Sequence, residues 1–293
     1  MNKTDYSGLL AVDVGNSRLK LGWYAPRGSC SDPVSVDPVS LHSLPIVSTV
    51  LPQPDDRLEL NCATADHPLD EELLRKWLET LPLSSTCCLV ASVQRTRLQQ
   101  VLGVLSEYQS SYRLMAPHVL RYDDLPMVVR VDHPQQVGID RLLCGVTANH
   151  LRSSERAATI VDMGSAITVD RVAADGAFEG GAILPGLAMS ACALQSGTDL
   201  LPRVLPEEEH AQPCALGKNT SAAITAGLYW GVIGAIRELV RQQMASTESP
   251  CELFITGGDA LRFAAGLQSQ DLTIHYQEQM VLTGIWIVAQ ELS

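Results

Sequence analysis

The stretch LLAVDVGNS at residues 9–17 decides the fold of this 293-residue chain. It reads as an apolar strand that runs into Asp-x-Gly and small amide and hydroxyl side chains, after which a second strand resumes at Arg18. Glycine lets the backbone approach a ligand closely, and successive N–H groups in a tight turn form a concavity suited to anions. The stretch predicts a phosphate-binding turn, the first turn (residues 13–20), with Lys20 close enough to add charge and with Asp13 able to hold a hydrated cation.

A second stretch of the same kind, TIVDMGSAIT, occupies residues 159–168 and predicts the second turn (residues 162–168). Asp162, at the end of an apolar strand, would cost several kcal/mol to bury unless it is paired or bound to a cation. One Asp-x-Gly turn alone is also ordinary hairpin chemistry. Two of them, in different halves of the chain, favour a nucleotide phosphotransferase whose turns face each other across a cleft.

Short strands and helices alternate along the chain, which indicates an α/β architecture. The strand, Asp-x-Gly turn and returning strand occur once in each half, so we expect two domains, at residues 1–154 and 155–293. Apolar periodicity and turn signals predict helices near residues 70–81, 96–108, 139–151, 220–244 and 280–292.

Three further segments carry candidate chemistry. Asp140, in VGIDR at residues 137–141, stands in the first turn of a predicted helix, where it could cap N–H groups or act as a base while Arg141 binds a substrate carboxylate. GGAILPG at residues 180–186 is either a packing bend or part of the site. TGGD at residues 256–259 would let a flat ligand such as adenine lie against the backbone, and a plain turn or cap is the alternative.

Composition narrows the function classes. The net charge of −12 argues against a nucleic-acid surface, which needs a basic stripe. The eight cysteines show no C-x-x-C spacing and are expected to be free thiols in a reducing compartment; the seven histidines form no pair with metal-ligand spacing. We expect no signal peptide, because the N-terminal residues are polar, and no membrane span, because no apolar run reaches the roughly 20 residues that a bilayer requires. The sequence therefore predicts a cytoplasmic protein without a membrane or nucleic-acid partner.

Taken in order, these motifs resemble the type III pantothenate kinases of the acetate kinase, sugar kinase, Hsp70 and actin superfamily. The resemblance covers nearly the whole chain and rests on these segments: Asp13 to Ser17, Ser92-Val93, Gly138 to Arg141, Asp162 to Thr168, Gly180 to Gly186, Gly217 to Thr220 with Gly227, and Thr256 to Asp259. Ser17 and Ser165 stand where the family commonly has Thr, and Val131 stands where a Tyr is usual.

The resemblance implies two RNase-H-like domains with a nucleotide cleft between them and transfer of the γ-phosphoryl group of ATP to pantothenate, the first step of coenzyme A synthesis. It implies Asp140 as the general base, Asp162 at a monovalent cation (K⁺ or NH₄⁺), Mg²⁺ held by Asp13 through water, and a homodimer. The implied ATP-binding residues are Asp13, Val14, Gly15, Asn16, Ser17, Arg18, Leu19, Lys20 and Ser165. The implied pantothenate-binding residues are Gly138, Ile139, Asp140, Arg141 and Thr220.

Two alternatives stay open on sequence alone. One is another enzyme of the superfamily, such as a kinase for a different small hydroxy acid or sugar, or a polyphosphate-type phosphatase. The other is a non-catalytic nucleotide-binding regulator resembling an accessory transcription factor. Retention of Asp13, Asp140 and Asp162 together favours catalysis, because a binding module needs no base.

Overall fold

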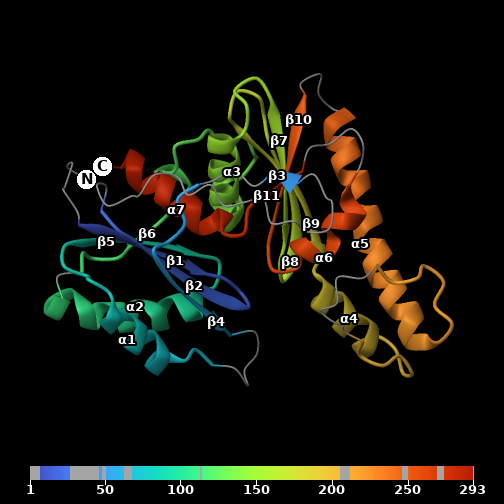
Figure 1. Cartoon of the computed structure of the whole chain (residues 1–293), viewed down its shortest axis with the longest axis horizontal. Coiled ribbons are helices and arrows are strands. Elements are labelled where there is room, and N and C mark those ends of the chain that lie inside the picture. The colour runs from blue at the N-terminus through green and yellow to red at the C-terminus, as the bar shows by residue number, and fades with distance from the viewer. Residues whose placement is uncertain are drawn as a thin grey trace. The chain divides into compact units, whose positions relative to one another are not determined.

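The computed structural model describes residues 7–26, 46–47, 51–62, 68–112, 114–204, 212–245, 250–268 and 274–292. These residues form two compact units (Figure 1). Unit 1 holds the described residues of 7–26, 51–150 and 279–292, and unit 2 holds 46–47 and 151–278. Each unit is an α/β body around its own sheet, as the sequence predicted.

Unit 1 is built on a five-stranded sheet in the order β4-β2-β1-β5-β6. The strands are β1 (Gly8–Val14), β2 (Arg18–Tyr24), β4 (Asp56–Asn61), β5 (Thr86–Ser92) and β6 (His118–Val119). β2 runs antiparallel to both β1 and β4, whereas β5 runs parallel to β1 and β6. The first turn therefore joins the central strand to its antiparallel neighbour.

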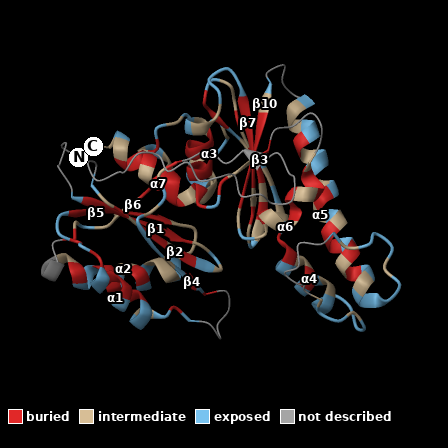
Figure 2. Ribbon diagram, viewed as in Figure 1, coloured by how far each residue is buried: buried red, intermediate tan, exposed pale blue. Residues whose placement is uncertain are grey.

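Helices cover both faces of this sheet. α1 (Glu71–Thr80) and α2 (Arg95–Tyr112) pack on one face, in a core that includes Leu10, Val12 and Val14 of β1 (Figure 2). α7 (Met280–Glu291) packs on β1, β2 and β5. It also contacts α3 (Ile139–Leu151), because the Gly284 backbone lies against Leu143 and the Thr147 hydroxyl donates to the Met280 carbonyl at 2.7 Å. Since side chains alternate along a strand, Asp13 shares its face of β1 with Leu9 and Ala11, opposite the α1 and α2 core.

Unit 2 repeats this strand pattern. β7 (Ala157–Met163) pairs antiparallel with β8 (Ala166–Val172), which pairs antiparallel with β9 (Phe178–Pro185). On its other side β7 pairs parallel with β10 (Cys251–Thr256), followed by β11 (Ile274–Tyr276) and β3 (Ile46–Val47). The order β9-β8-β7-β10-β11 thus matches β4-β2-β1-β5-β6 in direction and connectivity, which confirms the repeat expected from the two turns.

The helices of unit 2 are α4 (Leu187–Ser196), α5 (Thr220–Ala245) and α6 (Ala260–Leu267). Within the described part of the chain, α5 is long and apolar enough to cross a membrane by length and composition, which departs from the expectation of no such segment. A core helix passes the same test, and α5 buries a stripe at helical spacing in the unit 2 core. Its members are Ile224, Leu228, Tyr229, Ile233, Ile236 and Val240.

Two predictions from composition and boundaries can be compared with this architecture. The seven described cysteines are free, as expected, and Cys30 lies outside the described residues. The predicted division at residues 154 and 155 differs from the observed grouping at two elements, because α7 belongs to unit 1 and β3 belongs to unit 2. α7 groups with unit 1 because its apolar side packs on β1 and on α3.

Candidate functional site

The first turn is a tight β1–β2 connection. The Gly15 N–H donates to the Arg18 carbonyl at 2.9 Å, and a Cβ at Gly15 would lie 3.0 Å from that same oxygen. Asp13 is 9% exposed and lies opposite Lys20 in the antiparallel register. Directly opposed residues project to the same face of a sheet, so Lys20 lies on the Asp13 side of the strands. The turn places one carboxylate and one ammonium group beside a glycine backbone.

Neighbouring segments of unit 1 fix the turn from two sides. The Cys62 N–H donates to the Ser17 carbonyl at 2.8 Å, and the Val93 N–H donates to the Val14 carbonyl at 3.2 Å. The Arg97 guanidinium donates to the carbonyls of Gly15 at 2.9 Å and Asn16 at 3.0 Å. Arg97 was not predicted as a site residue, since no local motif marks it.

Asp140 belongs to the same unit and lies near this turn. Asp140 is the second residue of α3 and is half-buried. Its Oδ1 accepts the Arg141 N–H at 2.8 Å. A Cβ at Gly138 would lie 2.5 Å from that Oδ1 and 3.6 Å from the Val93 side chain. Since Val93 also bonds to Val14, one residue connects the Gly138–Arg141 segment to the first turn. Glycine at 138 is therefore what lets the Asp140 carboxylate occupy its position.

In unit 2, the second turn and the segment at residues 256–259 form one structure. Thr256 pairs with Asp162 across the parallel strands β10 and β7. Gly257 has φ +95, and a Cβ there would lie 2.5 Å from the Asp162 Oδ1 and from the Met163 carbonyl. The Asp259 N–H donates to that carbonyl at 3.0 Å. The carboxylate of Asp162 thus has a bare glycine backbone directly against it.

The segment at residues 180–186 reaches the same turn through its last glycine. The Gly186 N–H donates to the Ser165 carbonyl at 3.1 Å, and a Cβ at Gly186 would lie 2.4 Å from the carbonyls of Gly164 and Ser165. Ser165 itself is exposed. A glycine-only contact therefore packs the start of α4 against the second turn.

Thr220 is the first residue of α5 and is exposed. The preceding Asn219 caps the helix, because its Oδ1 accepts the Ala222 N–H at 2.8 Å. Gly217 lies against the backbone of Ala222 and Ala223, where a Cβ would come within 2.5 Å. The segment holds Thr220 at a defined helix start in unit 2.

The predicted site residues thus fall into two groups, each assembled within one unit. Unit 1 brings together the first turn and the Gly138–Arg141 segment. Unit 2 brings together Asp162, Ser165 and the glycine of residue 257, and it also holds Thr220. Among the described residues no group of three or more His, Cys, Asp or Glu side chains could hold a metal ion alone. A cation here would need phosphate, backbone or water oxygens as further ligands.

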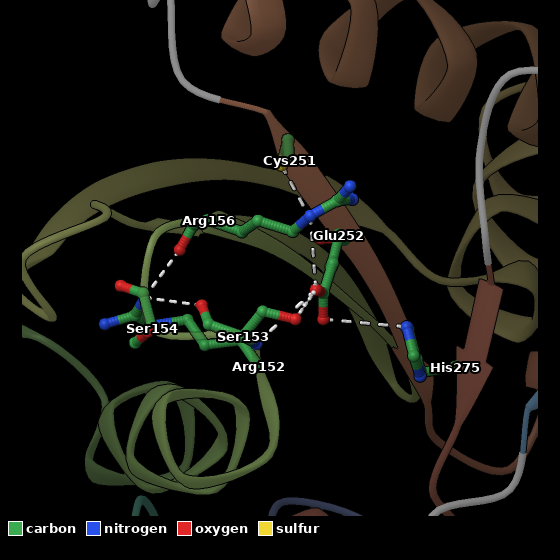
Figure 3. A network of polar contacts seen from close by, with 7 residues as sticks. All are labelled: Arg152, Ser153, Ser154, Arg156, Cys251, Glu252 and His275. Atoms are coloured by element: carbon green, nitrogen blue, oxygen red, sulfur yellow. Dashed lines mark hydrogen bonds and ion pairs between the residues drawn. The ribbon is translucent and has the colours of Figure 1, made fainter.

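A separate polar network lies at the other end of β10. Glu252 is 7% exposed, and Figure 3 shows Ser153, Arg156 and His275 directed at its carboxylate. The Ser153 hydroxyl donates to Oε1 at 2.7 Å, the Arg156 Nε lies 3.7 Å from the same oxygen, and the His275 Nε2 lies 3.6 Å from Oε2. The network joins the α3–β7 connection to β10 and β11, away from the second turn.

This network predicts a pH dependence of stability. Burial lowers the pKa of His275 from its ordinary 6.5, and the Glu252 charge only partly opposes that shift. Since the unfolded chain then binds the proton more readily, the stabilisation is complete above pH 6.5 and is lost as the pH falls through the lower native pKa. We expect the melting temperature of the wild type to fall as the pH drops below 6.5, and His275→Gln to flatten that part of the profile.

Melting curves between about pH 5 and 8, the range in which histidine titrates, measure this effect. The exposed His133 provides a control variant, His133→Gln, which should keep the wild-type profile. A His275→Gln profile as steep as that of the wild type would contradict the assignment.

Comparison with known proteins gives a consistent family. A family profile described as type III pantothenate kinase matches residues 47–242. A type III pantothenate kinase of Cereibacter sphaeroides is 34% identical over 230 residues, which is 77% of this chain and 86% of the relative. One of Hyphomonas neptunium is 32% identical over 210 residues, which is 67% of this chain and 79% of the relative. The profile match includes residues 138–141, 162–168 and 220, whereas residues 13–20 and 256–259 lie outside it.

Solved structures share the fold at low identity. MreB5 of Spiroplasma citri bound to ADP superimposes with a TM-score of 0.51 at 8% identity, covering 99% of this chain and 98% of that chain. A propionate kinase from Francisella tularensis gives a TM-score of 0.51 at 10% identity, covering 95% and 98%. These likenesses show that the chain has the actin and sugar-kinase type of fold.

Proposed function

Because the chain belongs to the type III pantothenate kinase family, we propose that it phosphorylates pantothenate with ATP, forming 4'-phosphopantothenate for coenzyme A synthesis. The observation that carries the proposal is that Asp140 and the first turn are assembled in one unit through Val93. A kinase needs its acceptor base beside its phosphate site, whereas a nucleotide-binding regulator does not. The regulatory alternative is therefore not favoured.

For the reaction, we assign ATP phosphates to the N–H groups and Lys20 of the first turn and to Ser165 of the second. Gly138, Ile139, Arg141 and Thr220 bind pantothenate in this proposal. Arg141 suits the pantothenate carboxylate, because a guanidinium binds a carboxylate through two parallel hydrogen bonds.

Asp140 accepts the proton of the acceptor hydroxyl in the proposed mechanism. Its hydrogen bond from the Arg141 N–H holds the carboxylate in one orientation, so that little reorganisation is needed when the hydroxyl attacks. Phosphoryl transfer depends mainly on positioning and charge neutralisation. Mg²⁺, when bound, would offset charge on the phosphates, and in this proposal Asp13 holds it through water.

The acceptor can be identified with a coupled assay of ADP release. Pantothenate should support turnover, whereas sugars and other small hydroxy acids at equal concentration should not. Equal or faster turnover with another acceptor would replace pantothenate as the substrate, and tight ATP binding without ADP release for any acceptor would favour the regulatory alternative.

We also propose that Asp162 binds a monovalent cation, K⁺ or NH₄⁺. The half-buried carboxylate lies near the Met163 carbonyl, since a Cβ at Gly257 would lie 2.5 Å from both oxygens, and oxygen donors of this kind suit hard cations. We expect turnover to rise at least severalfold when K⁺ replaces choline at constant ionic strength, and Asp162→Asn to weaken that activation. Equal rates of the wild type in both salts would contradict the assignment.

The exposed glycines of α5 suggest how two copies of the chain would associate. One surface of α5 carries Gly227, Gly231 and Gly234, where a Cβ would have no described atom within 4 Å apart from the helix's own backbone and the neighbouring residues. Small residues permit close helix approach, and we infer a homodimer that uses this surface. Light scattering would measure the oligomeric state.

We also propose that the enzyme acts in the cytoplasm, where its substrates are.

A further inference from the structure

Arg97 makes three hydrogen bonds that involve the first turn and the segment beside it. It is the third residue of α2, and its Nη1 donates to the carbonyls of Gly15 at 2.9 Å and Asn16 at 3.0 Å. Its Nη2 donates to the carbonyl of Cys62 at 2.6 Å. All three acceptors are backbone oxygens. A single guanidinium therefore holds two successive peptide groups of the turn, and one of the adjacent segment, in place.

These contacts set the direction of the N–H groups in the turn. A trans peptide is planar, and its C=O and N–H point in opposite directions. The Gly15 carbonyl shares a peptide with the Asn16 N–H, and the Asn16 carbonyl shares one with the Ser17 N–H. When Arg97 binds both carbonyls, both N–H groups are directed away from it. Successive N–H groups aimed to one side form the concavity that binds phosphate.

The contacts also close a ring of hydrogen bonds. Cys62 receives the Arg97 Nη2 bond on its carbonyl and donates its own N–H to the Ser17 carbonyl. Arg97, Cys62 and the turn therefore restrain one another. The ring fixes the turn before any ligand arrives, which reduces the ordering cost of binding.

Helix stability does not explain an arginine at this position. The positive end of a helix dipole lies at its N-terminus and disfavours cations there. α2 nevertheless begins with Arg95 and Arg97 and has no acidic residue in its first turn. The Gln94 side chain caps the helix by accepting the Arg97 N–H at 2.6 Å. A residue that breaks a local preference in this way is typical of a functional site.

We propose that Arg97 is a positioning residue of the ATP site, which aims the Asn16 and Ser17 N–H groups at the nucleotide phosphates. The inference rests on the proposed function. Arg97 acts through the backbone of the turn, so its loss should weaken ATP binding and leave pantothenate binding in place.

Arg97→Ala and Arg97→Lys test the inference. With the wild type active on pantothenate, both variants should raise KM for ATP by about 10–100-fold, the loss typical when a residue that orients a metal ligand is removed. KM for pantothenate should stay near the wild-type value. The lysine variant should remain impaired because an ammonium donates from a single nitrogen, whereas Arg97 uses Nη1 for the turn and Nη2 for the Cys62 carbonyl. Free guanidinium at a non-denaturing concentration should lower KM for ATP in Arg97→Ala and leave the wild type unchanged.

Arg75→Ala is the matched control. Arg75 in α1 also makes three hydrogen bonds, but it binds the side chains of Glu71 and Glu107. Its loss should change the melting temperature without changing KM for ATP. Either of two results would overturn the inference: a wild-type KM for ATP in Arg97→Ala, or a wild-type KM for ATP in Arg97→Lys. A wild type inactive on pantothenate would overturn the proposed function instead, and nucleotide binding by calorimetry would then test Arg97 separately.

Discussion

Asp140→Asn is expected to lower kcat by about 10²–10⁴-fold, the usual contribution of general-base catalysis. The asparagine keeps the size of the side chain and an oxygen that can accept the Arg141 N–H, as Oδ1 does now at 2.8 Å. What it loses is the ability to accept a proton. KM for ATP should therefore change little, and the melting temperature should stay close to that of the wild type. Steady-state kinetics and a melting curve on the same preparation measure both.

Asp70→Asn is the control for this substitution. Asp70 also lies at a helix start in unit 1, where its Oδ1 accepts the Leu73 N–H at 2.9 Å. Aspartate and asparagine are equally good at that position, so the control should retain full turnover. If Asp140→Asn turned over at the wild-type rate, Asp140 could not be the base.

Gly257→Ala should have the second large effect, by disturbing Asp162. The new Cβ would lie 2.5 Å from the Asp162 Oδ1 and from the Met163 carbonyl carbon and oxygen, at a φ of +95. The strained backbone alone costs about 1–3 kcal/mol, and relief of the clash must move the carboxylate or the strand end. Because a displacement of about 1 Å at a site can cost 10²-fold in rate, we expect a loss of about that size with a weaker response to K⁺.

Gly103→Ala separates this effect from a general response to removing glycine. Gly103 is exposed within α2, and apart from the helix's own backbone and the neighbouring residues no described atom lies within 4 Å of its Cβ position. Alanine there should stabilise the protein by about 0.5–1 kcal/mol and leave activity unchanged. Kinetics are compared on the folded fraction of each variant. A Gly257→Ala enzyme with both wild-type stability and wild-type K⁺ activation would exclude the role given to Asp162.

Local patterns were enough to predict the elements that carry the site. The α3 prediction, residues 139–151, matches the observed helix, and the last helix, expected at 280–292, spans Met280–Glu291. Asp-x-Gly at the end of an apolar strand correctly predicted two hairpins, because apolar alternation and glycine act over a few residues. The catalytic and binding roles of the site residues remain predictions, and the geometry within each unit is compatible with them.

Contacts between residues far apart in the sequence could not be predicted from local patterns. Arg97 is 82 residues from Gly15 and 35 from Cys62, and no periodicity reports such a pairing. The contact of Gly257 with Asp162 likewise depends on β10 pairing with β7, which a hydrophobic run alone cannot specify. The packing of α7 against unit 1 has the same origin, because its apolar surface fits either half of the chain.

The most direct test of the account is to incubate the purified protein with ATP, Mg²⁺ and pantothenate, with and without K⁺, and to identify the product by mass. The proposed reaction yields 4'-phosphopantothenate in amounts equal to the ADP formed, with K⁺ raising the rate. ADP without phosphorylated pantothenate, or no ADP under any of these conditions, would contradict it.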